Sequence, residues 1–332
     1  MLAAAALPAA AATAWEIQRR IDRRRIDADP LRPRLWAPLE GRPLSVSSAD
    51  GTPLHAEVFG PEDAPPVVLV HGWTCALRFW TLQIQELARD FRVIASDLRG
   101  HGSSGMPADR DYSTDAFADD LDAVLRAALR PGERAVVAGH SLGGMTVVAC
   151  AARHPERLRD SIAAAALVAT GMGDLVSESL VLRTPRRLGR VKAAVGRRML
   201  SASAPLPRRS TPISHRAIRY VTLSRSASPA AVAFCEEIVL ACRNDVRAAC
   251  GGTLSALDLR EAVAHLDVPT VVLAGERDKL TPPVHARWMA ETLPQVVELV
   301  EIPGAGHMLP VEAPGIVSSA IAQLARWVLA AA

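Results

Sequence analysis

Short runs of consecutive apolar residues recur along the chain and predict strands that are buried on both faces. Such strands show no regular alternation with polar residues, because neither face of the sheet meets water. The runs lie at residues 65–72, 91–104 (where a glycine-rich loop completes the run), 134–139, 161–170, 268–278 and 296–307. The pattern therefore predicts six buried strands.

Two further strands are expected at residues 42–60, where the Asp50-Gly51 pair is typical of a hairpin turn. Between the later strands lie amphipathic stretches such as residues 79–90. A helix is also expected to begin near Ser113 or Thr114, either of which can cap it. Strands and helices therefore alternate. This alternation predicts an α/β fold with a mostly parallel eight-stranded sheet and helices on both faces.

The alternation stops between about residues 171 and 265, where helical segments and loops replace it. We therefore predict three parts. The first is an apolar and arginine-rich amino-terminal segment, residues 1–41. The second is a core formed by residues 42–170 and 266–332. The third is a mostly helical insertion, residues 171–265.

Positive charge is distributed unevenly over a composition that is otherwise typical of a folded protein, with 49% hydrophobic and 22% charged residues. The net charge is +3, yet Leu180–Phe234 contains eleven arginines, Lys192 and no acidic residue. Arginine outnumbers lysine 36 to 2 overall, so the missing acids are more informative than the arginines. The segment is either a solvated surface or a patch for anionic substrates or lipid head groups. Because no nucleic-acid-binding motif accompanies it, we expect no nucleic-acid partner.

The first fifteen residues are apolar and precede an arginine-rich stretch, EIQRRIDRRR. Fifteen residues are fewer than the roughly twenty that span a bilayer. A secretory signal carries its positive charge before the apolar part, not after it. Three interpretations remain for the segment. It is a membrane tether or targeting segment, a peripheral alanine-rich helix, or an extra stretch from a start codon assigned too far upstream. The five cysteines match neither a disulfide framework nor a zinc site, so we expect a cytoplasmic protein. If the segment is a tether, the protein is also membrane-associated through it.

A single serine, Ser141, stands between a predicted strand and a predicted helix in the sequence VAGHSLGGMTV. A chain that passes from strand to helix within a few residues bends sharply and favours residues without a Cβ. Gly139 and Gly143 would allow this close approach and leave the serine hydroxyl exposed at the bend. A serine hydroxyl needs a neighbouring base that is itself oriented. Asp278 and His307 each follow a predicted strand, so both are expected at the same edge of the sheet as Ser141.

Five motifs in order, HGW, DLRGHGSS, GHSLGG, GERD and GAGHMLPVEAP, resemble the signatures of the α/β-hydrolase fold family. The resemblance covers roughly Arg42–Leu329 and excludes the interior of the 171–265 insertion. It implies that the insertion forms a helical lid over a substrate pocket.

The resemblance also implies a role for each matched residue. Ser141 would attack a carbonyl carbon, His307 would take and return the proton, and Asp278 would orient the imidazole. The backbone N–H groups of Trp73 and Leu142 would form the oxyanion hole.

Other polar residues are expected to have structural roles. We predict that His71 and His101 shape their loops, and that Asp97 ends its strand with local hydrogen bonds. Asp119 and Asp120 are predicted to form a solvated helix start. His215 and His265 are predicted to lie on the surface or in the insertion. Asp174 is the one rival to Asp278, because some members of the family place the acid after the preceding strand.

A serine nucleophile points to acyl transfer, because relatives that open epoxides or displace halide use an aspartate. The chain contains no metal-binding cluster, phosphate loop or dinucleotide fingerprint, so we expect catalysis without a cofactor or metal. The resemblance favours a carboxylesterase or lipase-like enzyme acting on a small ester with an apolar acyl group. A thioesterase or a carbon–carbon bond hydrolase would use the same triad. A non-catalytic binding protein is the alternative of a different class, although such proteins usually lose a triad member.

Overall fold

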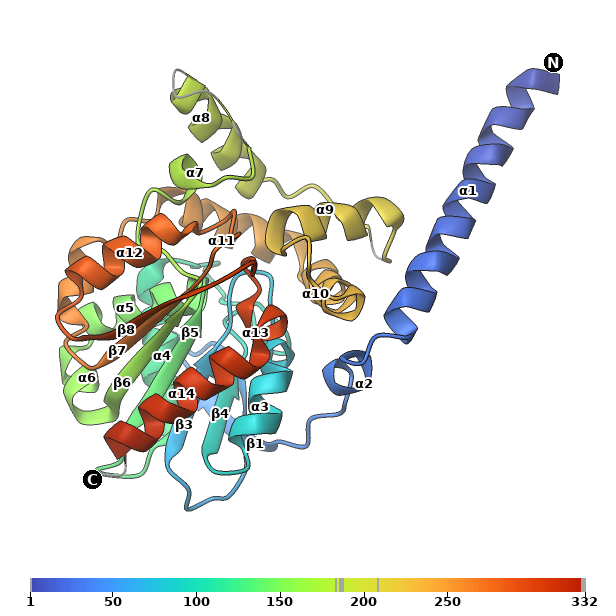
Figure 1. Cartoon of the computed structure of the whole chain (residues 1–332). Coiled ribbons are helices and arrows are strands. Elements are labelled where there is room, and N and C mark those ends of the chain that lie inside the picture. Colours follow the sequence, from blue (N-terminus) through green and yellow to red (C-terminus); the bar gives the residue numbers. More distant parts are fainter. Residues whose placement is uncertain (1, 183, 185–187, 208, 330–332) are drawn as a thin grey trace.

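An eight-stranded, mostly parallel sheet forms the centre of the protein, as the alternating pattern predicts (Figure 1). The computed structural model describes the backbone of residues 2–182, 184, 188–207 and 209–329, and side chains throughout these ranges except at residues 2–12 and 14. The strands are β1 (Arg42–Ser47), β2 (Pro53–Phe59), β3 (Pro66–Val70), β4 (Arg92–Ser96), β5 (Ala135–His140), β6 (Ile162–Val168), β7 (Thr270–Gly275) and β8 (Val296–Ile302). Their order is β1-β2-β4-β3-β5-β6-β7-β8.

The first two strands form the predicted antiparallel hairpin, whose turn contains Gly51 at φ +82°. Strand β2 also pairs antiparallel with β4, and all the remaining pairs are parallel. The parallel strands therefore point the same way, and the loops after them meet at one edge of the sheet.

Helices cover both faces of the sheet, which explains the continuous apolar runs. Along β3, Val68 and Val70 belong to one hydrophobic cluster, while Val67 and Leu69 belong to the cluster on the opposite face. The first face is covered by α4 (Thr114–Ala128), α5 (Leu142–Arg153), α6 (Pro155–Ser161) and α12 (Pro283–Thr292). The second is covered by the 3₁₀ helix η1 (Leu77–Trp80), α3 (Thr81–Leu87), α13 (Leu309–Glu312) and α14 (Pro314–Leu329). Ser113 caps α4, accepting a hydrogen bond from the Ala116 N–H.

The region between β6 and β7 is helical, as predicted, and it lies beyond one end of the strands (Figure 1). It contains α7 (Leu175–Glu178), α8 (Gly189–Leu200), α9 (Pro212–Thr222), α10 (Pro229–Ala241), α11 (Asn244–Ala256) and the 3₁₀ helix η3 (Glu261–His265). Apolar side chains of α10, among them Phe234, pack with Phe79 and Met308 of the core in a third hydrophobic cluster. Arg183, Arg186, Arg187 and Arg208 of the arginine-rich segment lie outside the described residues.

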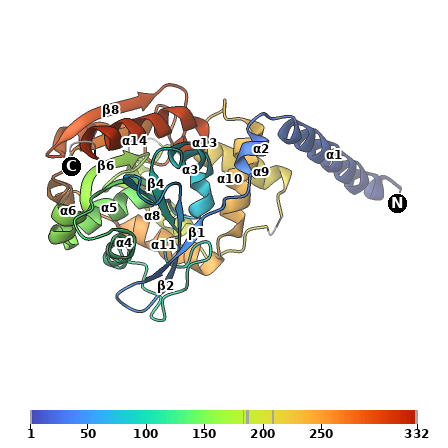
Figure 2. The same cartoon turned by 90° about the horizontal axis from the view of Figure 1, so that it is seen from below.

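The amino-terminal segment forms a long helix, α1 (Leu2–Asp27), and a short one, α2 (Arg32–Leu35). Helix α1 projects away from the sheet in both views (Figures 1 and 2). Its end is attached to α10, because the Asp29 carboxylate accepts a hydrogen bond from the Ala230 N–H (3.0 Å) and the Trp36 indole donates to Glu237 (2.9 Å). Across the part of the chain that is described, no helix combines the length and the apolar character that a membrane crossing needs.

Asp120 differs from the sequence expectation, because it is buried and not solvated. Its carboxylate accepts two hydrogen bonds from the guanidinium of Arg99, at 2.7 and 2.6 Å. Arg99 is itself only 1% exposed and also binds Asp50 in the β1–β2 hairpin (3.0 Å). Asp119 likewise pairs with Arg153 and His154. The periodicity of α4 could not reveal the burial of Asp120, because its partner Arg99 belongs to a different loop and points inward.

We expect the Asp120→Asn substitution to lower the free energy of unfolding by about 3 kcal/mol, because it leaves the Arg99 charge buried without its main partner. Urea denaturation monitored by circular dichroism measures the change. The control is Asp90→Asn, which breaks the exposed pair between Asp90 and Arg326 and is expected to cost less than about 1 kcal/mol. Equal losses of unfolding free energy in the two variants would show that the buried pair stabilises the protein no more than the exposed pair does.

Candidate active site

Ser141 occupies a strained turn between β5 and α5. Its backbone has φ +51° and ψ −117°, a combination that is costly for any residue with a Cβ. The turn is possible because the chain is closely packed at two glycines, as the sequence predicts. A Cβ on Gly139 would lie 2.4 Å from the carbonyl oxygen of Gly143, and a Cβ on Gly143 would lie 2.2 Å from that of Val70. These contacts leave no room for larger residues.

Backbone hydrogen bonds fix the position of Ser141 at the end of the sheet. Its N–H donates to the carbonyl of Val168 in β6 (2.9 Å), and its own carbonyl accepts from the Thr170 hydroxyl (2.7 Å). The residue is 9% exposed, and its hydroxyl has no hydrogen-bond partner among the described residues. The hydroxyl is therefore not tied to another protein group, but Ser141 is nearly buried and not exposed as the sequence analysis expected.

Asp278 and His307 are in direct contact at the same edge of the sheet. Asp278 lies three residues after β7 and His307 five residues after β8. The His307 Nδ1 lies 2.7 Å from Asp278 Oδ2, and both side chains are almost completely buried. We assign the Nδ1 proton to this hydrogen bond because its acceptor is a carboxylate. The opposite nitrogen, Nε2, then carries a free lone pair.

The Asp278 carboxylate is held by its own loop. Oδ1 accepts hydrogen bonds from the backbone N–H groups of Leu280 (2.8 Å) and Thr281 (2.9 Å). Oδ2 accepts a further bond from the Thr281 hydroxyl (2.8 Å), which also lies 3.2 Å from His307 Nδ1. Four donors therefore converge on one buried carboxylate and fix its orientation toward His307.

His140 joins the turn at Ser141 to the His307 loop. Its ring centroid lies 4.9 Å from that of His307, and its Nε2 lies 3.0 Å from the His307 carbonyl oxygen. Burial, and then the neighbouring His307, keep the pKa of His140 well below its usual value, so this ring is neutral. His307 is thus placed against the residue that immediately precedes Ser141.

The N–H groups of Trp73 and Leu142 flank Ser141 from two sides. Leu142 is the first residue of α5, and Trp73 follows Gly72, where a Cβ would lie 3.0 Å from the Ser141 Cβ. Neither N–H has a hydrogen-bond acceptor within the described chain. The Trp73 indole donates to the Arg247 carbonyl in α11 (3.0 Å), which fixes the side chain against the insertion.

The other polar residues that the sequence singles out have structural contacts. His71 accepts a hydrogen bond from the Leu98 N–H (3.0 Å), and His101 accepts one from the Thr74 N–H (3.2 Å). Burial lowers the pKa of His101 to about 4, which agrees with its role as a neutral acceptor. Asp97 accepts bonds from two backbone N–H groups at the end of its strand. The two histidines support their loops as predicted, whereas Asp97 also binds Leu77, twenty residues away, so its hydrogen bonds are not all local as expected.

Asp174, the rival acid, is not placed beside a histidine hydrogen-bond partner. It begins α7 with φ +54°, lies at the surface, and pairs with Arg260 at 2.8 Å. His215 lies in α9, within the insertion, and its Nδ1 is 3.0 Å from the buried Glu236. His265 lies in η3. The acid that contacts His307 is therefore Asp278.

Two residues of the site have contacts that the sequence analysis did not assign. His140 stands inside the GHSLGG motif. Its position in the sequence indicates that it lies near Ser141, but not that it contacts His307. Thr281 follows Asp278 by three residues, a spacing that allows a hydroxyl to bond back to a carboxylate. Both residues position other groups, and their contacts depend on how two distant loops pack.

Residues 65–314 match the family model described as the alpha/beta hydrolase fold. The chain belongs to the α/β-hydrolase fold family. One relative of this hydrolase is a pimeloyl-[acyl-carrier protein] methyl ester esterase from Chromobacterium violaceum, 31% identical over 76% of this chain and 91% of the relative. Another is 3-oxoadipate enol-lactonase 2 from Acinetobacter baylyi, 26% identical over 82% of this chain and 93% of the relative. A similar solved structure is that of a thermophilic esterase from Thermogutta terrifontis, with a TM-score of 0.68, 28% identity, and coverage of 87% of this chain and 99% of that one.

We expect Gly143→Ala to lower the free energy of unfolding of the hydrolase by about 2–4 kcal/mol, because the new methyl group collides with the Val70 backbone. Chemical denaturation measures the loss. The matched control is Gly252→Ala in α11, where a Cβ meets no atom within 4 Å. That substitution is expected to stabilise the protein by up to about 1 kcal/mol through helix propensity. If Gly143→Ala were as stable as the control, the close packing of the turn would be refuted.

Proposed function

We propose that this α/β hydrolase is a serine hydrolase that cleaves carboxylic esters through an acyl-enzyme on Ser141. The observation that carries the proposal is the buried 2.7 Å contact between His307 and Asp278 at the sheet edge that bears Ser141. A neutral imidazole with its Nδ1–H committed to a carboxylate presents Nε2 as a base.

In the first half-reaction the Ser141 Oγ attacks the ester carbonyl carbon, and its proton passes to His307 Nε2. The tetrahedral intermediate collapses when the alkoxy oxygen leaves and takes this proton, which releases an alcohol and leaves the acyl group on Ser141. Water then attacks the acyl carbon and gives its proton to Nε2. The acid is released when Ser141 regains that proton.

The oxyanion of each intermediate is stabilised by N–H groups that have no other acceptor. We assign this role to the backbone of Leu142 and Trp73, which flank Ser141. The first turn of α5 adds its positive dipole end. One such donor is worth about 3–4 kcal/mol in the transition state. Because both donors are backbone groups, the side chains at these positions can pack elsewhere, Leu142 in the core and Trp73 against α11.

An ester is the favoured substrate class because the relatives reported above are named for esters or for a lactone, which is a cyclic ester. We propose an apolar acyl group because Trp73, beside the oxyanion, packs on the apolar cluster that includes Val246 and Cys250 of α11. Thioester and carbon–carbon bond hydrolysis would use the same groups and differ only in the bond that breaks.

We propose that the helical insertion acts as the lid of this site. The insertion contacts the core at the two loops that carry Asp278 and His307. The Leu180 N–H donates to the Lys279 carbonyl (2.7 Å), and the His307 N–H donates to the Thr222 carbonyl (3.0 Å). Lys279 adds to this attachment, because its Nζ binds the Tyr220 carbonyl. Lys192 Nζ binds the Ser177 carbonyl within the insertion and links α8 to α7.

Labelling with a fluorophosphonate probe tests the proposal directly. We expect one adduct per chain at Ser141, detected by mass spectrometry, and none in Ser141→Ala. A panel of p-nitrophenyl esters of rising acyl length, beside acyl-coenzyme A thioesters, then ranks the substrate classes by kcat/KM. Absence of an adduct in folded protein would favour a binding role, and faster thioester turnover would replace the esterase by a thioesterase.

The choice of acid is tested by comparing two carboxylates. We expect Asp278→Asn to lower kcat for the best ester by about 10⁴-fold, because the amide no longer fixes the correct imidazole tautomer. Asp174→Asn is expected to leave kcat within about twofold, because that carboxylate forms only an exposed ion pair. The reverse result, with activity lost in Asp174→Asn and kept in Asp278→Asn, would overturn the assignment.

A further inference from the structure

The described arginines of Leu180–Phe234, within the insertion, differ from those of the core, because they form no ion pair with a carboxylate. Across the core, arginines such as Arg92, Arg153 and Arg287 form ion pairs with carboxylates. Within the described part of Leu180–Phe234, no arginine and no lysine forms one. The described cations are Arg190, Lys192, Arg197, Arg198, Arg209, Arg216, Arg219 and Arg225. Their charge is therefore uncompensated.

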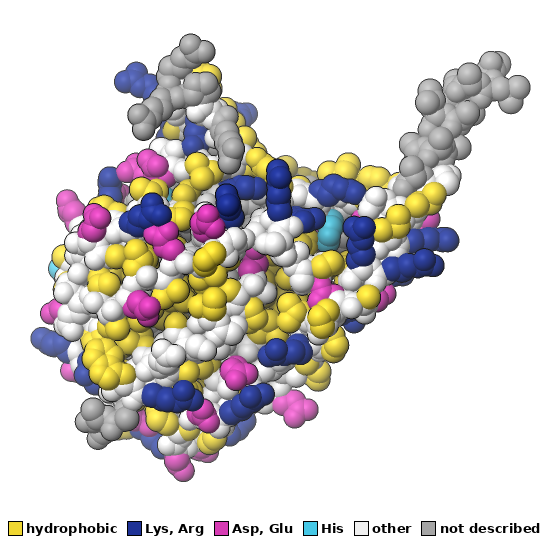
Figure 3. All heavy atoms as spheres, viewed as in Figure 1, with side chains coloured by type: hydrophobic (Ala, Val, Ile, Leu, Met, Phe, Trp, Pro, Cys, Tyr) yellow, Lys and Arg dark blue, Asp and Glu magenta, His cyan; other side chains and the backbone are white. Residues whose placement is uncertain are grey.

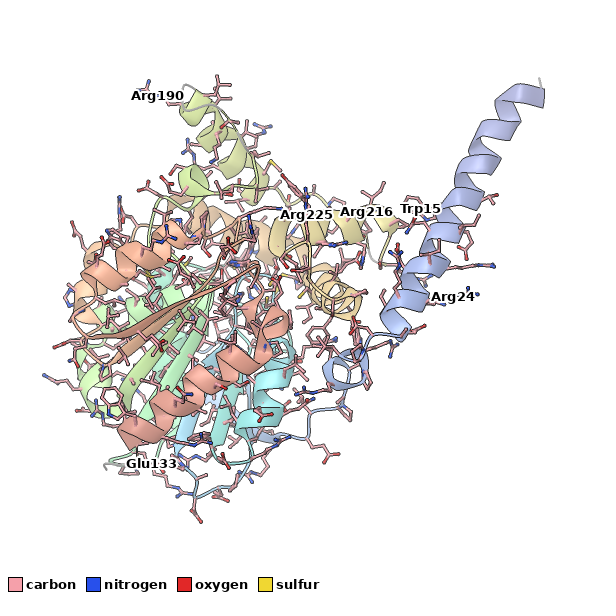
Figure 4. The ribbon with its side chains drawn as sticks, in the orientation of Figure 1. Trp15, Arg24, Glu133, Arg190, Arg216 and Arg225 are labelled. Atoms are coloured by element: carbon pink, nitrogen blue, oxygen red, sulfur yellow. The ribbon has the colours of Figure 1, made fainter. Side chains whose placement is uncertain are left out.

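These cations gather on one side of the molecule. Figure 4 shows Arg190, Arg216 and Arg225 along the edge formed by the insertion, and Glu133 at the opposite end of the sheet. In the space-filling view, dark blue side chains follow the same edge from α8 toward α1 (Figure 3). The unpaired charge thus forms one surface beyond the carboxyl ends of the strands.

Helix α8 exposes an apolar stripe within this charged surface. Leu188, Val191, Val195 and Met199 recur at helical spacing and are between 42% and 60% exposed. Arg190, Arg197 and Arg198 stand beside the stripe, also exposed. The helix has no buried residue, and its half-buried side rests on α11 and α7, where Gly251 approaches the Leu200 carbonyl and Gly196 approaches Val176.

Helix α9 repeats the same arrangement. Ile213 is 69% exposed and Tyr220, two turns later, is 52% exposed, with Arg216 and Arg219 between them. We call the exposed apolar and basic side chains of α8 and α9 the docking face. Exposed apolar side chains beside cations without acidic partners are typical of helices that lie in a membrane interface.

We propose that the docking face binds the surface of a bilayer that contains anionic phospholipids. The charge complementarity favours this occupant, because lipid phosphates neutralise the arginines while the acyl region accepts Val191, Val195 and Met199. A nucleic acid would match the charge but not the apolar stripe. A second copy of this chain would match the stripe but would bring a second uncompensated positive surface against the first.

The position of the docking face connects it to the candidate active site. Helix α9 ends at Thr222, whose carbonyl accepts the hydrogen bond from the His307 N–H (3.0 Å). A bilayer bound to α8 and α9 therefore lies on the insertion side of the sheet, where the proposed site is. Docking itself does not depend on the proposed hydrolysis, so Ser141→Ala is expected to bind vesicles as the wild type does.

The test uses the full chain with a fluorescent reporter on α8. Val195→Cys is labelled with an environment-sensitive dye in a Cys242→Ser background, because Cys242 is the one native cysteine that is not buried. We expect blue-shifted and several-fold brighter emission on vesicles of phosphatidylcholine with about 30% phosphatidylglycerol. High salt, or vesicles of phosphatidylcholine alone, should reverse most of the change. The matched control is the same dye at Val297→Cys, an equally exposed site in β8, which should not respond.

Two sets of substitutions separate the two parts of the docking face. In vesicle flotation, Arg190→Gln with Arg197→Gln and Arg198→Gln should weaken binding to anionic vesicles by about 100-fold, since each cation near the surface contributes about a factor of five. Val191→Ser with Val195→Ser and Met199→Ser should weaken it by at least tenfold. The matched control replaces three exposed apolar residues of the core and should leave vesicle binding unchanged: Val284→Ser with Val297→Ser and Ile316→Ser.

Three results would overturn the proposal. One is flotation of the chain with no emission change at position 195, which would place the contact in another segment. Another is an equal response to neutral and anionic vesicles. The third is failure to float together with self-association that the serine variants abolish, which would make the face an interface between copies.

Discussion

The turn between β5 and α5 has no space for a Cβ at Gly139 or Gly143, and this constraint determines where the residues of the candidate site lie. Gly143 approaches the Val70 carbonyl because β3 and the start of α5 are in contact. The same contact brings the loop after β3, with the Trp73 N–H, beside Ser141. A serine with φ +51° is costly, and the packing of the central strands supplies the stability that maintains it. The site is therefore a consequence of how closely three central elements approach one another.

The fold could be predicted from the sequence because its signals are local. A strand such as β3 is apolar at every position, since both of its faces are covered, and this pattern does not depend on which strand lies next to it. The positions of Ser141, Asp278 and His307 could also be predicted, because each follows such a strand within a few residues. Parallel strands deliver these residues to one edge whatever the details of packing.

Other features depend on pairs of residues that are distant in the sequence. Asp120 has the helical position of a solvated residue, and only the inward course of Arg99 makes it buried. The contact of His140 with His307 joins residues 167 positions apart. The apolar residues of α10 indicate burial, but nothing in their order reveals that Phe79 and Met308 cover them. The periodicity of apolar residues indicates that one face of a helix or strand is buried, but it does not identify the residues that bury it.

The near absence of lysine has a practical consequence for following the insertion. The chain has two ε-amino groups. That of Lys192 binds a backbone carbonyl within the insertion, and that of Lys279 joins the core to the Tyr220 carbonyl of the insertion. Isotope-labelled methyl groups introduced on amines would give two side-chain resonances in an NMR spectrum, apart from that of the chain terminus. One would report on α8 within the insertion, and the other on the contact between the insertion and the core. The composition thus provides a built-in spectroscopic marker of whether the helices over the sheet edge move.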